Sequence, residues 1–324
     1  MVRVRHSLFS RRRFFQASVI AVASRLTAQP QGTVLPVKFW RLPDFLPDDS
    51  VHDASGQGDH LAFLTFNGAR KQQVLRVTDL DGRPKWQYAV PPDMRYGKIH
   101  VSASGSVMAY ALIRTTRHLV EHEPAGGGMR VVADDRSPGP WFHFFVSDRL
   151  TMIRPDATLE YFDGATWRRQ ASVGRFDPVC TKAFGLEDRV LMVDHCEGGL
   201  SWQVYASGEV GRRVLASPAV AASRAEAASF QATRVRPPGD NTRPRTSVIG
   251  GMDVAGASLW CYLLPFDKKI GLVLEEFTLE GQLRRSLRLD VPKEGRLVPI
   301  KILALPRGCL SLVFPNGVVA MYRL

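Results

Sequence analysis

A short apolar segment recurs along this chain, and its spacing limits the folds that the chain can adopt. The segments begin at Leu61, Val107, Leu150, Val190, Leu259 and Leu310. Successive starts are separated by 46, 43, 40, 69 and 51 residues. Helical periodicity is scarce beyond the first 28 residues. A period of about 40 to 50 residues with several strands in each unit is typical of a β-propeller.

A glycine-centred corner follows each apolar segment. The corners are Asp81-Gly82, Gly126–Gly128, Asp163-Gly164, Ser207-Gly208, Glu280-Gly281 and Asn316-Gly317. Because glycine readily adopts the positive φ that tight hairpins need, each corner predicts a further strand behind it. Because six apolar segments are matched by six corners, the sequence predicts an all-β fold, namely a six-bladed propeller. A seventh blade would have to lie in the long interval between 209 and 247.

That interval also holds the least strand-like part of the chain. Residues 219–228 are rich in alanine and predict a short helix. Residues 234–245 read RVRPPGDNTRPR, and proline lacks the amide donor that a sheet needs. We therefore expect an insertion between blades around 219–247. Its basic part is either a solvated loop or a docking arm for an anionic surface.

The two ends of the chain predict how the ring closes. The last unit holds only three predicted strands, roughly 299–305, 310–314 and 318–323. Val37–Arg41 is an unpartnered strand near the start of the chain. We expect it to supply the missing outer strand of the last blade, because closure removes exposed sheet edges.

The first 28 residues predict export rather than fold. The segment from Ser10 through Arg11, Arg12 and Phe14 resembles the twin-arginine export motif, and an apolar stretch and a small-residue end at Ala28 follow it. We expect a signal peptide over 1–28, cleaved after Ala28 or after residue 23, and a periplasmic or secreted propeller domain over 29–324. A membrane anchor is the weaker alternative, because a spanning helix needs about 20 apolar residues. A basic amphipathic surface helix is another.

The charge of the chain indicates which partners it can bind, and its cysteines indicate which compartment it suits. The leader holds six arginines and no acidic residue, so the formal charge of +12 falls to +6 without it. A mildly basic surface suits an anionic partner, and the lack of a basic-aromatic motif argues against nucleic acid. Cys180 and Cys196 are close enough to form a disulfide across one hairpin, with buried free thiols as the alternative. For Cys261 and Cys309 we expect free buried thiols.

Two propeller families resemble this chain. Over about residues 35–324 its architecture resembles six-bladed NHL-like propellers and related exported bacterial propellers, without sharing a specific motif. The unit Thr78–Trp86 is similar to a repeat of the pyrroloquinoline-quinone-type propellers, with a Trp four residues after Gly82. Asp163–Trp167 resembles it more weakly. This second resemblance implies a quinoprotein-like role, but the other units lack the Trp.

Five basic residues are candidates for a ligand site at one end of the channel. We align the units on their apolar segments and count back into the preceding, innermost strand. The candidates then fall seven to nine residues before the segments, and they are His52, His100, His143, Lys182 and Lys301. The three histidines would bind a metal or an anionic ligand, or would be ordinary polar residues on a wet wall. The lysines favour an anion, such as a carboxylate or a phosphate.

The remaining motifs do not identify a reaction. The chain has no Gly-Lys-Ser/Thr phosphate loop and no Gly-x-Ser-x-Gly elbow, and we assign it no cofactor, although a metal ion stays open. We expect a monomeric, non-catalytic binding or scaffolding module for a protein, a saccharide or a small anionic ligand, without a stable membrane span. The alternatives are a hydrolase or lyase with a channel-mouth site for a small anionic substrate, and a quinoprotein-like propeller.

Overall fold

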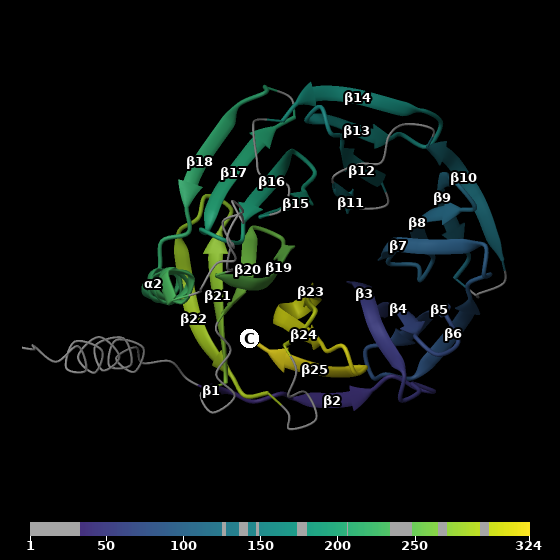
Figure 1. The fold of residues 1–324 in the computed structure, drawn as a ribbon, viewed down its shortest axis with the longest axis horizontal. Coiled ribbons are helices and arrows are strands. Elements are labelled where there is room, and N and C mark those ends of the chain that lie inside the picture. The colour runs from purple at the N-terminus through teal and green to yellow at the C-terminus, as the bar shows by residue number, and fades with distance from the viewer. Residues whose placement is uncertain are drawn as a thin grey trace, which may run out of the picture.

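The described part of the chain forms six β-sheets arranged as blades around a central channel (Figure 1). The structure is a computed structural model. It describes residues 33–124, 128–135, 142–146, 149–173, 180–205, 207–233, 248–264, 271–291 and 298–324. The six-bladed propeller predicted from the repeat is therefore confirmed, and the alternative of a seventh blade is not.

Each blade is built on four antiparallel strands, and the chain enters each blade on the channel side. Blade 1 holds β3 (Asp49–Gln57), β4 (His60–Asn67), β5 (Gln72–Asp79) and β6 (Pro84–Ala89). Blade 2 holds β7 (Met94–Val101), β8 (Val107–Ile113), β9 (Thr116–His122) and β10 (Met129–Asp135). Blade 3 holds β11 (Phe142–Val146), β12 (Arg149–Ile153), β13 (Thr158–Phe162) and β14 (Trp167–Ser172).

The second half of the chain repeats this arrangement. Blade 4 holds β15 (Thr181–Gly185), β16 (Arg189–Asp194), β17 (Gly199–Val204) and β18 (Val210–Val214). Blade 5 holds β19 (Ile249–Ala255), β20 (Ser258–Leu263), β21 (Leu272–Thr278) and β22 (Leu283–Leu289). Blade 6 holds β23 (Lys301–Leu305), β24 (Cys309–Val313) and β25 (Val318–Arg323).

The N-terminal strands close the ring. Strand β2 (Lys38–Arg41) pairs antiparallel with β25 and is the outer strand of blade 6, as predicted from the sequence. Strand β1 (Thr33–Val34) pairs in parallel with β22, so the same segment also binds blade 5. The Trp40 ring packs against Gly82 of blade 1, where φ is +81° and a Cβ atom would lie 2.5 Å from the ring. One short segment therefore ties together three blades.

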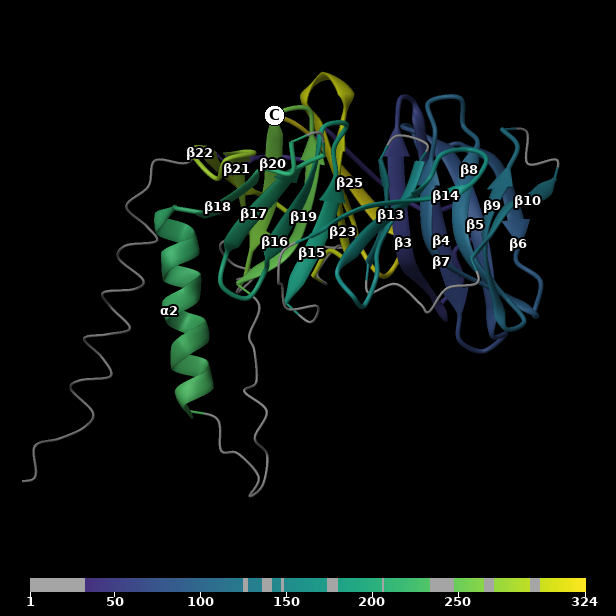
Figure 2. The same cartoon turned by 90° about the horizontal axis from the view of Figure 1, so that it is seen from above.

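The long interval in the repeat holds a helix instead of another blade. Helix α2 (Pro218–Thr233) lies outside the ring beside β18 and β22, with its axis along that of the ring (Figures 1 and 2). The Ser217 hydroxyl accepts the Val220 amide at 2.9 Å, and Pro218 follows it directly, so the helix has a favourable start. The helix is longer than the 219–228 segment expected. The basic segment 234–245 lies outside the described residues.

The apolar core is divided among the interfaces between blades. Each pair of neighbouring blades encloses its own cluster of buried side chains among the described residues. At the inner edge, polar groups link neighbouring blades. The Asp53 carboxylate accepts the Ile99 amide at 3.1 Å, and the Asp253 carboxylate accepts the Ala304 amide at 2.8 Å. These bonds hold the channel wall rigid.

The predicted leader stays outside what the structure describes. Residues 1–28, with Ser10, Arg11, Arg12 and Phe14, lie among the residues that are not described. Within the described ranges, no helix combines the length and the apolar character needed to cross a membrane.

Candidate functional site

The central channel forms a large cavity in the described structure. The innermost strands of all six blades line it, and it has a volume of about 760 Å³. Small-molecule sites usually have volumes of about 300 to 1,000 Å³. The channel is therefore large enough for a small organic ligand.

Titratable side chains from all six blades line this channel, and six of them, one on each blade, form a polar ring. In blade order its members are Asp53, Lys98, His143, Lys182, Asp253 and Lys301. Lysines occupy every second blade, so the positive charges are spread around the ring. Lysines outnumber carboxylates by three to two among the described residues that line the channel. The ring therefore favours an anion over a cation.

Asp53 is the acidic centre of this ring. It is 2% exposed, and its Oδ1 atom lies 2.8 Å from Lys301 Nζ and 3.5 Å from Lys98 Nζ. Burial would raise the pKa of Asp53, but the two ammonium groups outweigh burial and hold its pKa below the usual range. For Lys301 the directions are opposite, since burial would lower its pKa but the ion pair with Asp53 raises it. Asp53 and Lys301 are therefore both charged at neutral pH.

Asp253 occupies the corresponding place in blade 5 but has a weaker electrostatic partner. Burial raises the pKa of Asp253 to about 6, against the lowering effect of the Ala304 amide and of Lys301. Its negative charge is thus lost in mildly acidic solution. The net charge of the ring becomes more positive as the pH falls through 6.

Lys182 is the member of the ring with an uncompensated charge. Its side chain is exposed to the channel, and no described residue forms an ion pair or a hydrogen bond with its ammonium group. The enclosing walls and the like charges of Lys301 and Lys98 lower its pKa to about 8. An anion in the channel would relieve this repulsion.

His143 is a neutral member of the ring. Its ring lies 4.7 Å from that of Tyr110, and its buried Nε2 atom has no hydrogen-bond partner among the described residues. Burial first, and the charge of Lys98 second, lower its pKa to about 4. At neutral pH His143 therefore carries no charge, and its unpaired Nε2 atom is buried in the channel wall.

All five candidates predicted from the sequence line the channel. His143, Lys182 and Lys301 belong to the polar ring, whereas His52 and His100 lie on the same innermost strands as Asp53 and Lys98. His52 is exposed and packs against Phe66, with ring centroids 5.2 Å apart. His100 stacks on Phe145 at 5.1 Å. The three histidines therefore contact three different rings rather than one another.

The prediction missed three members of the ring, Asp53, Lys98 and Asp253. Each follows a β-bulge in its innermost strand, with the register shifting between Val51 and Asp53, between Tyr96 and Lys98, and between Ile249 and Gly251. A bulge inserts one residue and so reverses which side chains face the channel. Asp53 and Lys98 lie eight and nine residues before their apolar segments, inside the range of the candidates, so spacing alone did not distinguish them from their neighbours. The glycines at 97, 250 and 251 were the available signal, since a glycine inside a strand often marks a bulge.

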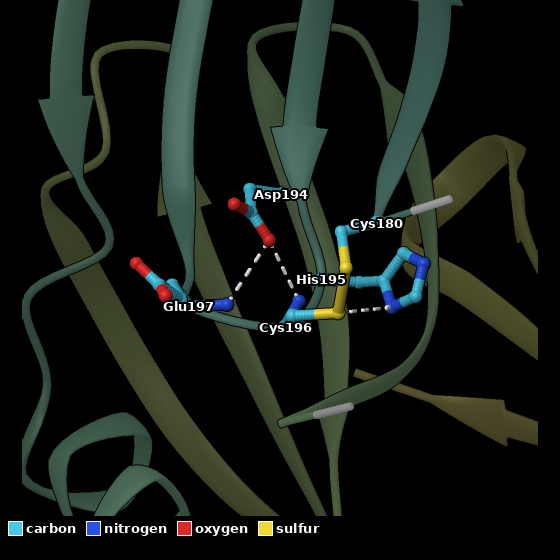
Figure 3. Close-up of a disulfide and its surroundings, with 5 residues drawn as sticks. All are labelled: Cys180, Asp194, His195, Cys196 and Glu197. Carbon is cyan, nitrogen blue, oxygen red and sulfur yellow. Dashed lines mark hydrogen bonds between the residues drawn. A yellow bond between two sulfur atoms is a disulfide. The ribbon is translucent and has the colours of Figure 1, made fainter. Parts of the chain in front are cut away.

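A second cluster of possible metal-binding side chains lies beside the first two strands of blade 4, β15 and β16. The structure joins Cys180 and Cys196 in a disulfide across the hairpin of β15 and β16, with Cα atoms 5.6 Å apart (Figure 3). The Asp194 carboxylate accepts the amides of Cys196 and Glu197 at 2.8 and 3.1 Å (Figure 3). Asp194 and the two sulfurs have the ligand types of a metal site and lie within 4.8 Å of one another. Because the sulfurs are bonded to each other, this cluster stabilises the hairpin instead.

The other two cysteines are free. Cys261 is buried, as expected, whereas Cys309 is only half-buried. Burial raises the pKa of the Cys261 thiol far above its usual range, so it is an unreactive core residue.

Comparison with known proteins supports the fold. No protein-family model and no curated protein matches the sequence. The structure is similar to virginiamycin B lyase from Staphylococcus aureus, with a TM-score of 0.52 and 11% identity over 89% of this chain and 98% of that chain. It is also similar to a protein of unknown function from Bacteroides thetaiotaomicron, with a TM-score of 0.51 and 13% identity over 90% of this chain and 73% of that chain. BamB from Moraxella catarrhalis has a TM-score of 0.41 and 12% identity over 90% of this chain and 98% of that chain. At these identities the two matches with TM-scores above 0.5 support the fold alone, and the blades themselves define the class, a six-bladed β-propeller.

Proposed function

We propose that this protein is a non-catalytic binding protein that holds a small anion in its central channel. The observation that supports the proposal is the uncompensated ammonium group of Lys182, which faces a cavity that already contains two further lysines. Buried or enclosed charges are normally paired. An anionic ligand, such as a carboxylate or a phosphate, would supply the missing partner.

The rigid wall suits a binding role. The ring residues lie on the innermost strands, which are hydrogen-bonded within each blade and linked between blades through Asp53 and Asp253. A preformed site loses little conformational entropy when a ligand binds. Lys98 and Lys301 each use part of their donor capacity on Asp53, and an ammonium group has three donors, so both can also contact the ligand.

Calorimetric titration of the purified protein tests this proposal. Phosphate and pyruvate are the probes, and Lys182→Met is compared with Lys85→Met, which removes an exposed lysine outside the channel. We expect the Lys182 variant to lose about tenfold in affinity, because one charged hydrogen bond contributes about 1.5 to 3 kcal/mol. Equal affinity in the two variants, or no binding by the parent protein, would contradict the proposal.

One observation favours an enzyme as the second candidate. The ammonium group of Lys182, with a pKa of about 8, would serve as an acid near neutral pH, and the neutral imidazole of His143 lines the same channel on the neighbouring blade. This arrangement suits a hydrolase or lyase acting on a small anionic substrate. A His143→Gln variant that binds anions normally but loses turnover of a substrate found by screening would favour the enzyme.

We also propose that the protein is exported through the twin-arginine route. The Cys180–Cys196 disulfide supports this proposal, because such bonds persist mainly in oxidising compartments. Fractionation of cells that express the full chain tests it. We expect Arg11→Lys with Arg12→Lys to retain the protein in the cytoplasm, and unchanged export of that variant would contradict the route.

A further inference from the structure

We propose that Lys182 is a nucleophile that forms an imine with the carbonyl group of an oxo acid bound in the channel. This inference rests on the proposed function, because the channel must first admit the anion. It specifies the ligand class further, since a plain carboxylate or phosphate offers no carbon for the amine to attack.

The place of Lys182 in the fold supplies the geometric support. The side chain is exposed to the channel and none of the described residues engages its amine. Its backbone is held in β15, where Lys182 pairs with Val193 of β16. The amine therefore approaches the channel from a fixed strand. By contrast, Lys98 and Lys301 both contact Asp53, at 3.5 and 2.8 Å, and remain cations.

The electrostatic environment makes this amine reactive. Only an unprotonated amine attacks a carbonyl carbon, and a neighbouring cation is one way to obtain it. With a pKa of about 8, roughly one Lys182 amine in ten is unprotonated at pH 7, compared with fewer than about one in a thousand for an ordinary lysine. The lysines that suppress the charge of Lys182 would also hold the carboxylate of the ligand.

The reaction requires no external oxidant or reductant. The nitrogen lone pair of Lys182 adds to the carbonyl carbon, and one proton passes from the nitrogen to the carbonyl oxygen through solvent in the channel, which gives a carbinolamine. A second proton from the solvent then protonates the hydroxyl group, the carbon–oxygen bond breaks, and one water leaves. The remaining N–H proton of the iminium ion returns to the solvent. The products are the imine and water.

Reductive trapping tests the inference. The full protein is incubated with pyruvate and sodium cyanoborohydride near neutral pH and analysed by intact mass and peptide mapping. We expect one carboxyethyl group on each molecule, located on Lys182. Acetone, a neutral ketone, should give at least about tenfold less adduct, because the lysines that hold a carboxylate do not hold it.

Two variants make the result specific. Lys182→Arg retains a cation in the channel but cannot form the imine, so it should still bind pyruvate and lose the adduct. Lys85→Arg removes an exposed lysine and should leave the adduct unchanged. Binding of pyruvate without an adduct on Lys182 would overturn this inference and leave the proposed function intact. No binding at all would overturn both. An adduct spread evenly over the surface lysines would also overturn the imine inference.

Discussion

At the scale of single residues, the charge of Lys182 depends on its neighbours across the channel. Lys98→Met removes one of the two like charges that lower its pKa from 10.5 to about 8, so we expect this pKa to rise. NMR titration of isotopically methylated lysines measures it. Lys85→Met, outside the channel, is the control and should leave the Lys182 titration unchanged. An unchanged pKa in Lys98→Met would mean that burial and Lys301 set the value without Lys98.

The same residues predict how anion binding depends on pH. Above about pH 8 Lys182 loses its charge, so affinity should fall by up to about tenfold in all, the loss expected for Lys182→Met. Below about pH 6 Asp253 becomes neutral, so affinity should increase. Calorimetry with acetate, a carboxylate that cannot form an imine, at pH values below, between and above these limits measures both effects. In the Lys182→Arg variant the affinity should no longer fall at high pH, because arginine keeps its charge. If the affinity still falls in this variant, another group is responsible for the pH dependence.

His122 is a buried histidine whose titration affects stability. It is fully buried in blade 2, its Nε2 atom lies 2.8 Å from the Tyr96 hydroxyl, and the rings of Trp86 and Tyr88 pack around it. Burial lowers its pKa from 6.5 to about 4. The unfolded chain therefore binds a proton between these values while the folded chain does not, so stability decreases as the pH falls through this window.

We expect this single group to remove about 3 kcal/mol of unfolding free energy between pH 7 and pH 4. His122→Gln retains a hydrogen-bonding side chain that does not titrate, so its stability should depend less on pH. Urea denaturation across the window measures the difference. His118→Gln, on the same strand, should keep the dependence of the parent protein, and an equal slope in His122→Gln and the parent would refute the assignment.

At the scale of secondary-structure elements, the disulfide fastens the first hairpin of blade 4. It joins residues 16 apart, and a loop of that size contributes about 3 kcal/mol in the chain-entropy model. The His195 carbonyl also accepts the amides of Val248 and Ile249 at 2.8 and 3.0 Å, so the same turn contacts blade 5. Loosening of the hairpin should therefore spread to the neighbouring blade.

We expect Cys180→Ser with Cys196→Ser to lower the unfolding free energy by about 3 kcal/mol, as measured by urea denaturation. Adding a reductant should destabilise the parent protein by a similar amount. The same reductant should leave the double variant unchanged, because Cys261 and Cys309 are free thiols. A reductant effect that persists in the variant would place the sensitive bond elsewhere.

At the scale of the whole molecule, the N-terminal segment determines whether the ring is closed. Strand β2 covers the edge of β25, and Trp40 packs on Gly82 of blade 1 and lies 5.9 Å from Phe63. A chain that begins at residue 42 would expose the β25 edge, and an unpaired edge strand promotes association.

We expect this truncation to lower the Tm by roughly 5 °C or more and to cause association that increases with protein concentration. Differential scanning fluorimetry and light scattering measure the two effects. A chain that begins at residue 33 keeps β1 and β2 and is the matched control. A monomeric truncated protein with the Tm of that control would show that closure does not depend on this strand.

Much of this architecture follows from local sequence patterns. Apolar segments such as Leu61–Phe66 and the glycine corners are short-range features, because strand alternation and positive φ depend on neighbouring residues only. The six blades and the closing strand were therefore predictable from spacing, whereas for Cys180 and Cys196 spacing allowed a disulfide without deciding between it and free thiols. Helix α2 was predicted in part, since its alanines were visible but its start depends on the Ser217 cap.

The candidate site was decided by the tertiary structure. The sequence placed Lys182, Lys301 and His143 on innermost strands, but the bulges before Asp53, Lys98 and Asp253 changed the side chains that face the channel. Local sequence does not determine the electrostatic interactions among these groups either, because they act across the channel between residues distant in the chain. The sequence by itself thus determined a closed six-bladed ring, whereas only the assembled ring brought these charges close enough to shift their pKa values.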